Sequence, residues 1–137
     1  MSISLYANRR LSVGREANVG SSDLLTVDIV ARGSAVVVSV RGELDLATVP
    51  VLRGRLGSVD EVSASPSAMV VDLSEVTFIG SAGLALLVDL HNRCGERGIP
   101  LAVVATGSVV PRAIQVTALD QVFSVYGTLD EAIGDAT

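Results

Sequence analysis

The sequence predicts an α/β fold with a four- to five-stranded mixed sheet and helices packed mainly on one face of that sheet. β-rich runs alternate with helix-patterned segments in the order ββαβαβα(β)α, which is typical of strands that share a sheet with helices layered on it. The chain has 137 residues, and 49% of them are apolar. That length and composition suit one domain with a single sizeable core.

A hairpin is predicted to open the domain. Residues 1–22 are polar, and we expect them to form an N-terminal extension, with the folded domain at 23–137. Leu24–Ala31 and Ala35–Val40 are β-rich and flank a short glycine-containing turn, which is a hairpin signal. A third strand, Ala68–Leu73, is apolar enough to be central, and a polar break follows it.

Three helices are predicted at about 48–58, 82–96 and 109–118 from the spacing of their apolar residues. Thr48 is a plausible N-cap of the first helix, which has Val49, Leu52, Leu56 and Val59 on one face. Short strands at 101–105 and 122–126 and a last helix near 128–133 complete the order. The side chains expected to be buried between the layers are those of Leu52, Leu84, Leu87 and Ile114.

Charge and cysteine content exclude several classes of protein. The formal net charge of −5, with no basic stripe, argues against direct binding to nucleic acid. The single cysteine, Cys94, excludes an internal disulfide and suits a reducing compartment. No signal peptide or membrane-spanning run is present, so we expect a cytoplasmic protein. No phosphate-cradling loop is found, and no cofactor is predicted.

Ser81 is the residue that most suggests function. It stands in Gly80-Ser81-Ala82-Gly83, where a strand is predicted to give way to a helix. One interpretation is structural: Ser81 is the N-cap of that helix. The other is functional: the flanking glycines let another chain approach, and a phosphate on Ser81 would be tolerated at a helix N-terminus.

Other candidate sites have weaker support. His91 and Cys94 are three residues apart on one helix, but no second cluster would complete a metal site, so we favour core packing. Glu43 and Asp45 could suggest Mg²⁺ or acid–base chemistry, but a solvated loop between strand and helix explains them better. His91 lies about 15 Å along the helix from Ser81, too far for a Ser–His hydrolase. We therefore expect that the protein is not an enzyme.

Three motifs in order resemble the STAS domain of the anti-sigma factor antagonist family. They are "VVVSVRGELDLATVPVLRGRL", "MVVDLSEVTFIGSAGLALLVDL" and "ALDQVFSVYGTLDEAI". The resemblance spans roughly Leu24 to Ala132 and implies the STAS fold.

The resemblance also implies a partner-switching function. Such antagonists bind an anti-sigma factor that is also a serine kinase, and so regulate transcription that depends on a sigma factor. The kinase phosphorylates a serine that aligns with Ser81, the phosphorylated form is released, and a serine phosphatase resets it. The residues that the resemblance assigns to partner binding are Glu43, Asp45, Thr48, Gly80, Ser81, Ala82 and Gly83. A monomer or weak dimer without membrane contact is expected.

Two positions depart from the family pattern. Gly80 replaces the acid that normally precedes the phosphoacceptor, and Ala82 replaces the following serine or threonine. These departures leave an alternative open, in which the chain is an unphosphorylated STAS interaction module of another complex, such as a transport assembly.

Overall fold

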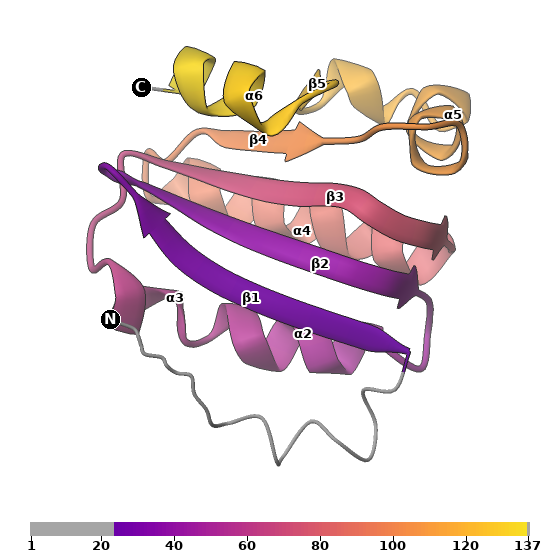
Figure 1. The fold of residues 1–137 in the computed structure, drawn as a ribbon, viewed down its shortest axis with the longest axis horizontal. Helices are drawn as coiled ribbons and strands as arrows, with labels where there is room; N and C mark the ends of the chain where they lie inside the picture. The colour runs from indigo at the N-terminus through magenta and orange to yellow at the C-terminus, as the bar shows by residue number, and fades with distance from the viewer. Residues whose placement is uncertain (1–23, 137) are drawn as a thin grey trace.

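The computed structural model describes residues 24–136, so the predicted extension at residues 1–22 lies outside the described part of the chain. The elements in chain order are β1 (Leu25–Arg32), β2 (Ala35–Leu44), α2 (Val49–Leu56), α3 (Val59–Val62), β3 (Ala68–Ile79), α4 (Ser81–Glu96), β4 (Leu101–Val104), α5 (Val109–Val116), η2 (Leu119–Gln121), β5 (Ser124–Tyr126) and α6 (Leu129–Ala136). Figure 1 shows the strands as a single twisted sheet with the helices layered against it.

The five strands confirm the predicted mixed sheet. Their order is β1-β2-β3-β4-β5; β1 is antiparallel to β2, and the other neighbours are parallel. The predicted hairpin is also confirmed, with Arg32 opposite Ala35. Gly33 in its turn has a φ of 63°, a left-handed conformation that glycine adopts without steric cost.

Apolar layers lie on both faces of the sheet. The larger one packs β1–β4 against α2, α3, α4 and α5, and it contains Leu52, Leu87 and Ile114, each 1% exposed, as predicted. The smaller one packs β2, β3 and β4 against Ala132 of α6. Helices therefore cover mainly one face, which confirms that prediction, and α6 is the exception among the described helices.

β3 is longer than predicted. We expected it to end at Leu73, but it continues to Ile79, because the polar residues that follow Leu73 remain paired with β2. Two register shifts in this pairing add residues to β3 opposite β2. The buried residues Leu73, Val76 and Ile79 therefore recur every third position instead of every second. Strict alternation of buried and exposed residues, the usual signal of a strand, is therefore absent from residues 73–79. For this reason the sequence did not indicate a strand there.

Two other predicted boundaries are wrong. The helix predicted at 48–58 is α2, which ends at Leu56, so Val59, expected on the same helix face, reaches the core from the separate short helix α3. The last strand starts at Ser124 and not at Val122. The reason is that the backbone N–H of Phe123 donates to the Leu119 carbonyl oxygen, in the helical turn that precedes the strand.

Leu84 is half-buried and not fully buried as predicted. The buried stripe of α4 consists of Gly83, Leu86, Leu87, Leu90 and Cys94, at helical spacing. The stripe begins at Gly83, one residue before the first leucine of the helix, so Leu84 lies beside the stripe and not within it. The small Gly83 takes the position nearest the sheet at the start of α4.

Asp89 links α2 to α4 at the surface. Its carboxylate accepts from Arg53 of α2 at 2.8 Å and pairs with Arg93 of its own helix at 3.2 Å. The hydrogen bond from Arg53 is the main reason that the pKa of Asp89 is lowered from its ordinary value. Both pairs are exposed, so apolar packing supplies most of the attachment between these helices.

Cys94 is 4% exposed and belongs to the core, as predicted. Burial disfavours the thiolate and raises the pKa of Cys94, an effect that nearby Arg97 partly offsets. We predict that a thiol reagent labels the folded protein slowly at neutral pH and quickly in denaturant, since the thiolate is the reactive form. Labelling kinetics with and without urea test this, and rapid labelling of the native chain would contradict it.

Ala118 has a φ of 61°, in the left-handed region that an alanine side chain disfavours. We predict that Ala118→Gly increases the free energy of unfolding by about 0.5–1 kcal/mol, because glycine relieves this strain. Urea denaturation measures the change. Ala113→Gly within α5 is the control, and there the same replacement should destabilise the protein. Loss of stability in Ala118→Gly would contradict the prediction.

Candidate functional site

The candidate site lies at the edge of the sheet where two neighbouring parallel strands end. Leu44 at the end of β2 is opposite Ile79 at the end of β3, and Figure 1 shows the two arrowheads side by side. The backbone N–H of Gly80 donates to the Leu44 carbonyl oxygen at 2.9 Å. This bond joins the loop after β2 to the start of α4, so one edge carries all seven residues predicted to bind a partner.

Ser81 is exposed and is the first residue of α4. The N-cap position belongs to Gly80, which has extended backbone angles of φ −97° and ψ −176°. Within residues 24–136 the Ser81 hydroxyl makes no hydrogen bond. The structural interpretation of Ser81 as a helix N-cap is therefore wrong, and its hydroxyl has no role in holding this helix.

The start of α4 also has the polarity that accommodates an anion. The first helical hydrogen bond runs from the Leu84 N–H to the Gly80 carbonyl oxygen at 3.1 Å. The N–H groups of Ser81, Ala82 and Gly83 precede it, so they have no acceptor within the helix. Since α4 is 16 residues long, its dipole makes this end partially positive.

Gly83 is buried, so it does not lie on the exposed surface around Ser81. A Cβ atom there would lie 2.8 Å from Ile79 Cγ1 and 3.1 Å from Leu44 Cβ. Gly83 was expected to let another chain approach closely. Instead, it lets β2 and β3 of the same chain pack closely against the start of α4. Gly80 differs, because a Cβ there would meet the Phe78 ring at an ordinary contact distance of 3.4 Å.

The difference between the two glycines is testable. We predict that Gly83→Ala lowers the free energy of unfolding by about 1–2 kcal/mol, because overpacking outweighs the better helix propensity of alanine. Gly80→Asp should keep the stability or raise it by a few tenths of a kcal/mol, since aspartate is a good N-cap. Urea denaturation of both variants measures this. Equal stability of Gly83→Ala and the unmodified protein would show that α4 can move away from β2.

The loop after β2 is shaped by Asp45 and Thr48. Asp45 Oδ1 accepts from the backbone N–H groups of Ala47 at 3.0 Å and Thr48 at 3.1 Å, which is the role of an N-cap. Thr48 occupies the N-cap position of α2, as predicted, but its side chain makes no capping bond to that helix. Its hydroxyl instead donates to the Glu43 carbonyl oxygen at 2.6 Å and accepts from the Asp45 N–H at 3.0 Å. Thr48 is only 1% exposed, so it acts from inside the loop.

Glu43 belongs to the end of β2 and not to a loop, and its side chain is half-buried. Its carboxylate makes no hydrogen bond or ion pair within the described residues, whereas the Asp45 carboxylate is used by the loop. Within the described residues, the other candidate sites are not supported as metal sites. No group of three or more His, Cys, Asp or Glu residues in the range 24–136 could hold a metal ion. His91, considered above with Cys94, lies against the Phe123 ring, with the ring centroids 6.3 Å apart.

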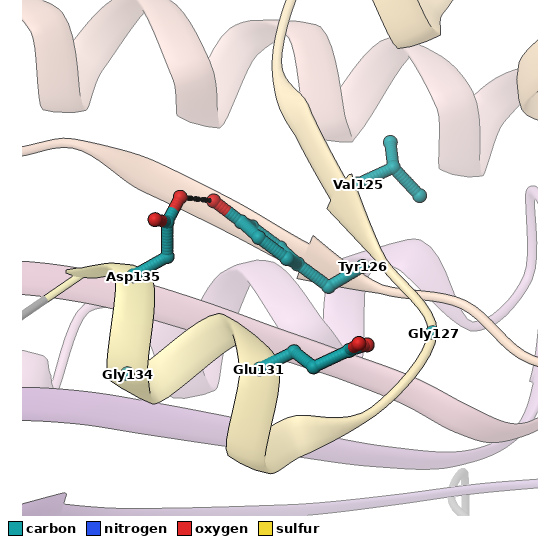
Figure 2. Close-up of a pocket in the computed structure, with 6 residues that line it drawn as sticks. All are labelled: Val125, Tyr126, Gly127, Glu131, Gly134 and Asp135. Atoms are coloured by element: carbon teal, nitrogen blue, oxygen red, sulfur yellow. Dashed lines mark hydrogen bonds between the residues drawn. The ribbon is translucent and has the colours of Figure 1, made fainter.

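A separate depression of about 530 Å³ is open to solvent between β5 and α6. Figure 2 shows the Tyr126 ring lying between Asp135 and Glu131, with its hydroxyl bonded to the Asp135 carboxylate. This hydrogen bond is the main reason that the pKa of Tyr126 is raised. None of the lining residues is a predicted site residue, and the depression shares no residue with the edge that carries Ser81.

Comparison with known proteins identifies the class of this chain. Residues 26–132 match the STAS domain family, so the chain belongs to the STAS domain family. The structure described above, a five-stranded mixed sheet covered mainly on one face, agrees with that assignment. None of the helices between residues 24 and 136 is long and apolar enough to cross a membrane.

Individual relatives confirm the resemblance to anti-sigma factor antagonists. The chain is 36% identical over 115 residues to the anti-sigma-F factor antagonist RsfB of Mycobacterium tuberculosis, covering 84% of this chain and 92% of RsfB. It matches the crystal structure of an anti-sigma factor antagonist from Mycobacterium paratuberculosis with a TM-score of 0.75 and 39% identity, over 82% and 93% of the two chains. The anti-sigma factor antagonist SpoIIAA in its unphosphorylated form shares the fold, with a TM-score of 0.62 and 20% identity over 80% and 92% of the two chains.

The sequence interpretation missed two apolar residues of this edge. Leu46 in the loop after β2 is 82% exposed, and Phe78 near the end of β3 is 48% exposed. The exposure of Leu46 had one indication in the sequence, since Leu46 is an apolar residue inside a loop that was expected to be solvated. The exposure of Phe78 had no such indication, because its position in β3 depends on the register of that strand with β2.

Proposed function

We propose that this protein is an anti-sigma factor antagonist, which docks onto an anti-sigma factor with serine kinase activity and is released when that kinase phosphorylates Ser81. The names of the mycobacterial relatives support the first part. The observation that carries the second part is the exposed Ser81 hydroxyl, which is not used by the fold at the start of α4. A hydroxyl with no partner of its own is accessible to a kinase without any unfolding of the helix.

The chain acts as a substrate in this scheme and has no catalytic role. The Ser81 oxygen forms a bond to the γ-phosphorus of ATP, ADP leaves, and the hydroxyl proton passes to the kinase. A serine phosphatase then hydrolyses the phosphate ester with water and restores the hydroxyl. The antagonist therefore alternates between two charge states, and its partners supply the chemistry in both directions.

The added charge has different effects on the fold and on docking. A phosphate brings nearly two negative charges to a protein with a formal charge of −5. At the start of α4 the helix dipole favours such a charge by about 0.3–1 kcal/mol, so the fold should persist. At an interface, an unpaired charge costs several kcal/mol to desolvate, and about 1.4 kcal/mol already changes affinity tenfold. The phosphate should therefore act on binding.

The departures at Gly80 and Ala82 are compatible with this proposal. Neither residue adds bulk in front of the Ser81 hydroxyl, and Gly80 leaves room at the N-cap position. They remove an acid and a hydroxyl from the surface that a kinase would contact, so the cognate kinase must recognise this antagonist by other features of the same edge.

Two variants of Ser81 test the switch. We predict that Ser81→Asp folds normally but binds the anti-sigma kinase at least about tenfold more weakly, because a charge then lies in the interface. Ser81→Ala should bind as the unmodified protein does and should resist phosphorylation. Calorimetry against the anti-sigma factors of the source organism measures the affinities. Intact-mass measurement after incubation with each kinase and ATP detects the phosphate.

Ser124→Asp is the matched control, because Ser124 is an exposed serine on the edge strand β5. It adds the same charge away from the candidate site and should leave binding unchanged. Equal affinities of Ser81→Asp and Ser81→Ala, together with no mass increase, would contradict the switch. That outcome would favour the unphosphorylated STAS module of another complex, the alternative to which Gly80 and Ala82 point.

A further inference from the structure

Two large apolar side chains are exposed at the edge that carries Ser81. Leu46, at 82%, is the most exposed large apolar residue in the described range, and Phe78 is 48% exposed. Leu46 follows the end of β2, Phe78 is the second-last residue of β3, and these two strand ends are paired. Exposed apolar side chains that gather beside a candidate site mark a surface for protein contact. We call these two residues the Leu46/Phe78 surface.

The hydrogen bonds that hold the loop after β2 do not involve the Leu46 side chain. The carboxylate of Asp45 holds the N–H groups of Ala47 and Thr48, and the Thr48 hydroxyl holds the Glu43 carbonyl and the Asp45 N–H. All these bonds involve neighbours of Leu46, and none involves its side chain. The loop is therefore fixed before any partner arrives, which lowers the entropic cost of burying Leu46 in an interface.

Phe78 occupies the surface immediately before Ser81. Two of its ring carbons lie 3.4 and 3.7 Å from the point where a Cβ of residue 80 would be. Because residue 80 is glycine, the ring itself is the surface that a partner meets there. A side chain at position 80 would begin against that ring and cover part of it.

Glu43 adds a charge to this apolar surface. It lies directly opposite Phe78 in the pairing of β2 with β3, and its carboxylate has no ion-pair partner between residues 24 and 136. Glu75, further back on β3, is already paired with Arg41 at 3.0 Å. A partner that complements this surface would therefore need an apolar hollow for the side chains of Leu46 and Phe78 and a positively charged group near Glu43.

We infer that the Leu46/Phe78 surface is the part of this edge that anchors and selects the anti-sigma factor. This inference rests on the proposed function, since the occupant it names is the anti-sigma factor. It also accounts for release. A phosphate on Ser81 keeps its hydration, so water enters the contact between the partner and the neighbouring apolar side chains.

The experiment uses the anti-sigma-F factor of M. tuberculosis, the target that the name of RsfB prints, and the anti-sigma factors of the source organism as probes. Calorimetry first establishes which of them binds the unmodified chain. Leu46→Ala and Phe78→Ala should each weaken that complex about tenfold or more, as expected for buried apolar anchors. Val116→Ala is the control, because Val116 is 76% exposed at the end of α5, and it should change the affinity by less than about twofold.

Gly80→Asp adds a charge beside the Phe78 ring and leaves both apolar side chains in place. It should weaken binding, since the complex would then have to desolvate a carboxylate next to the Phe78 ring. Glu43→Gln should weaken binding and reduce its salt dependence, because it removes a charge pair with the partner. Thermal unfolding of each variant confirms that the fold is intact.

The possible outcomes separate this inference from the proposed function. If no anti-sigma factor binds the unmodified chain, the proposed function is overturned, and this inference fails with it. If one binds, but Leu46→Ala and Phe78→Ala match the unmodified chain, only this inference is overturned. Stronger binding by Gly80→Asp would also overturn it, because the contact around the Phe78 ring would then favour a charge over an apolar surface.

Discussion

The junction between Leu44 and the first turn of α4 is the contact on which the candidate site depends. The Leu44 carbonyl accepts from the Gly80 N–H, and the Leu44 Cβ lies only 3.1 Å from the point where a Cβ on Gly83 would be. These contacts bring the end of β2 against the start of the helix that follows β3. Together with the pairing of Leu44 and Ile79, they place Ser81 and the loop after β2 on one surface.

Residues that shape this edge differ from those that are free to contact a partner. Asp45, Thr48 and Gly83 satisfy hydrogen bonds or packing inside the protein, and Thr48 and Gly83 are buried. Ser81 and Leu46 are exposed, and neither side chain holds the fold together. A charge added at such a position changes the outer surface and leaves the support beneath it intact. That division is what the phosphorylation switch proposed above requires.

Much of the fold could be predicted from local patterns. The hairpin, the buried face around Leu87 and the order of strands and helices follow from turn chemistry and periodicity, which depend on near neighbours in the chain. The errors arose where distant segments decide. The bulges that carry β3 on to Ile79 depend on its register with β2, and the half-buried Leu84 depends on how α4 is rotated against the sheet.

The sequence by itself determined the mixed α/β sheet, the burial of Cys94 and the place of Ser81 at the start of a helix, because these follow from short-range spacing and composition. Only the tertiary structure decided what each residue of the site does there. It made the Asp45 carboxylate the acceptor for the N–H groups of Ala47 and Thr48, and it buried Thr48 and Gly83. It left Ser81 and the Phe78 ring exposed. Such roles depend on which parallel strands end side by side, and no local pattern contains that information.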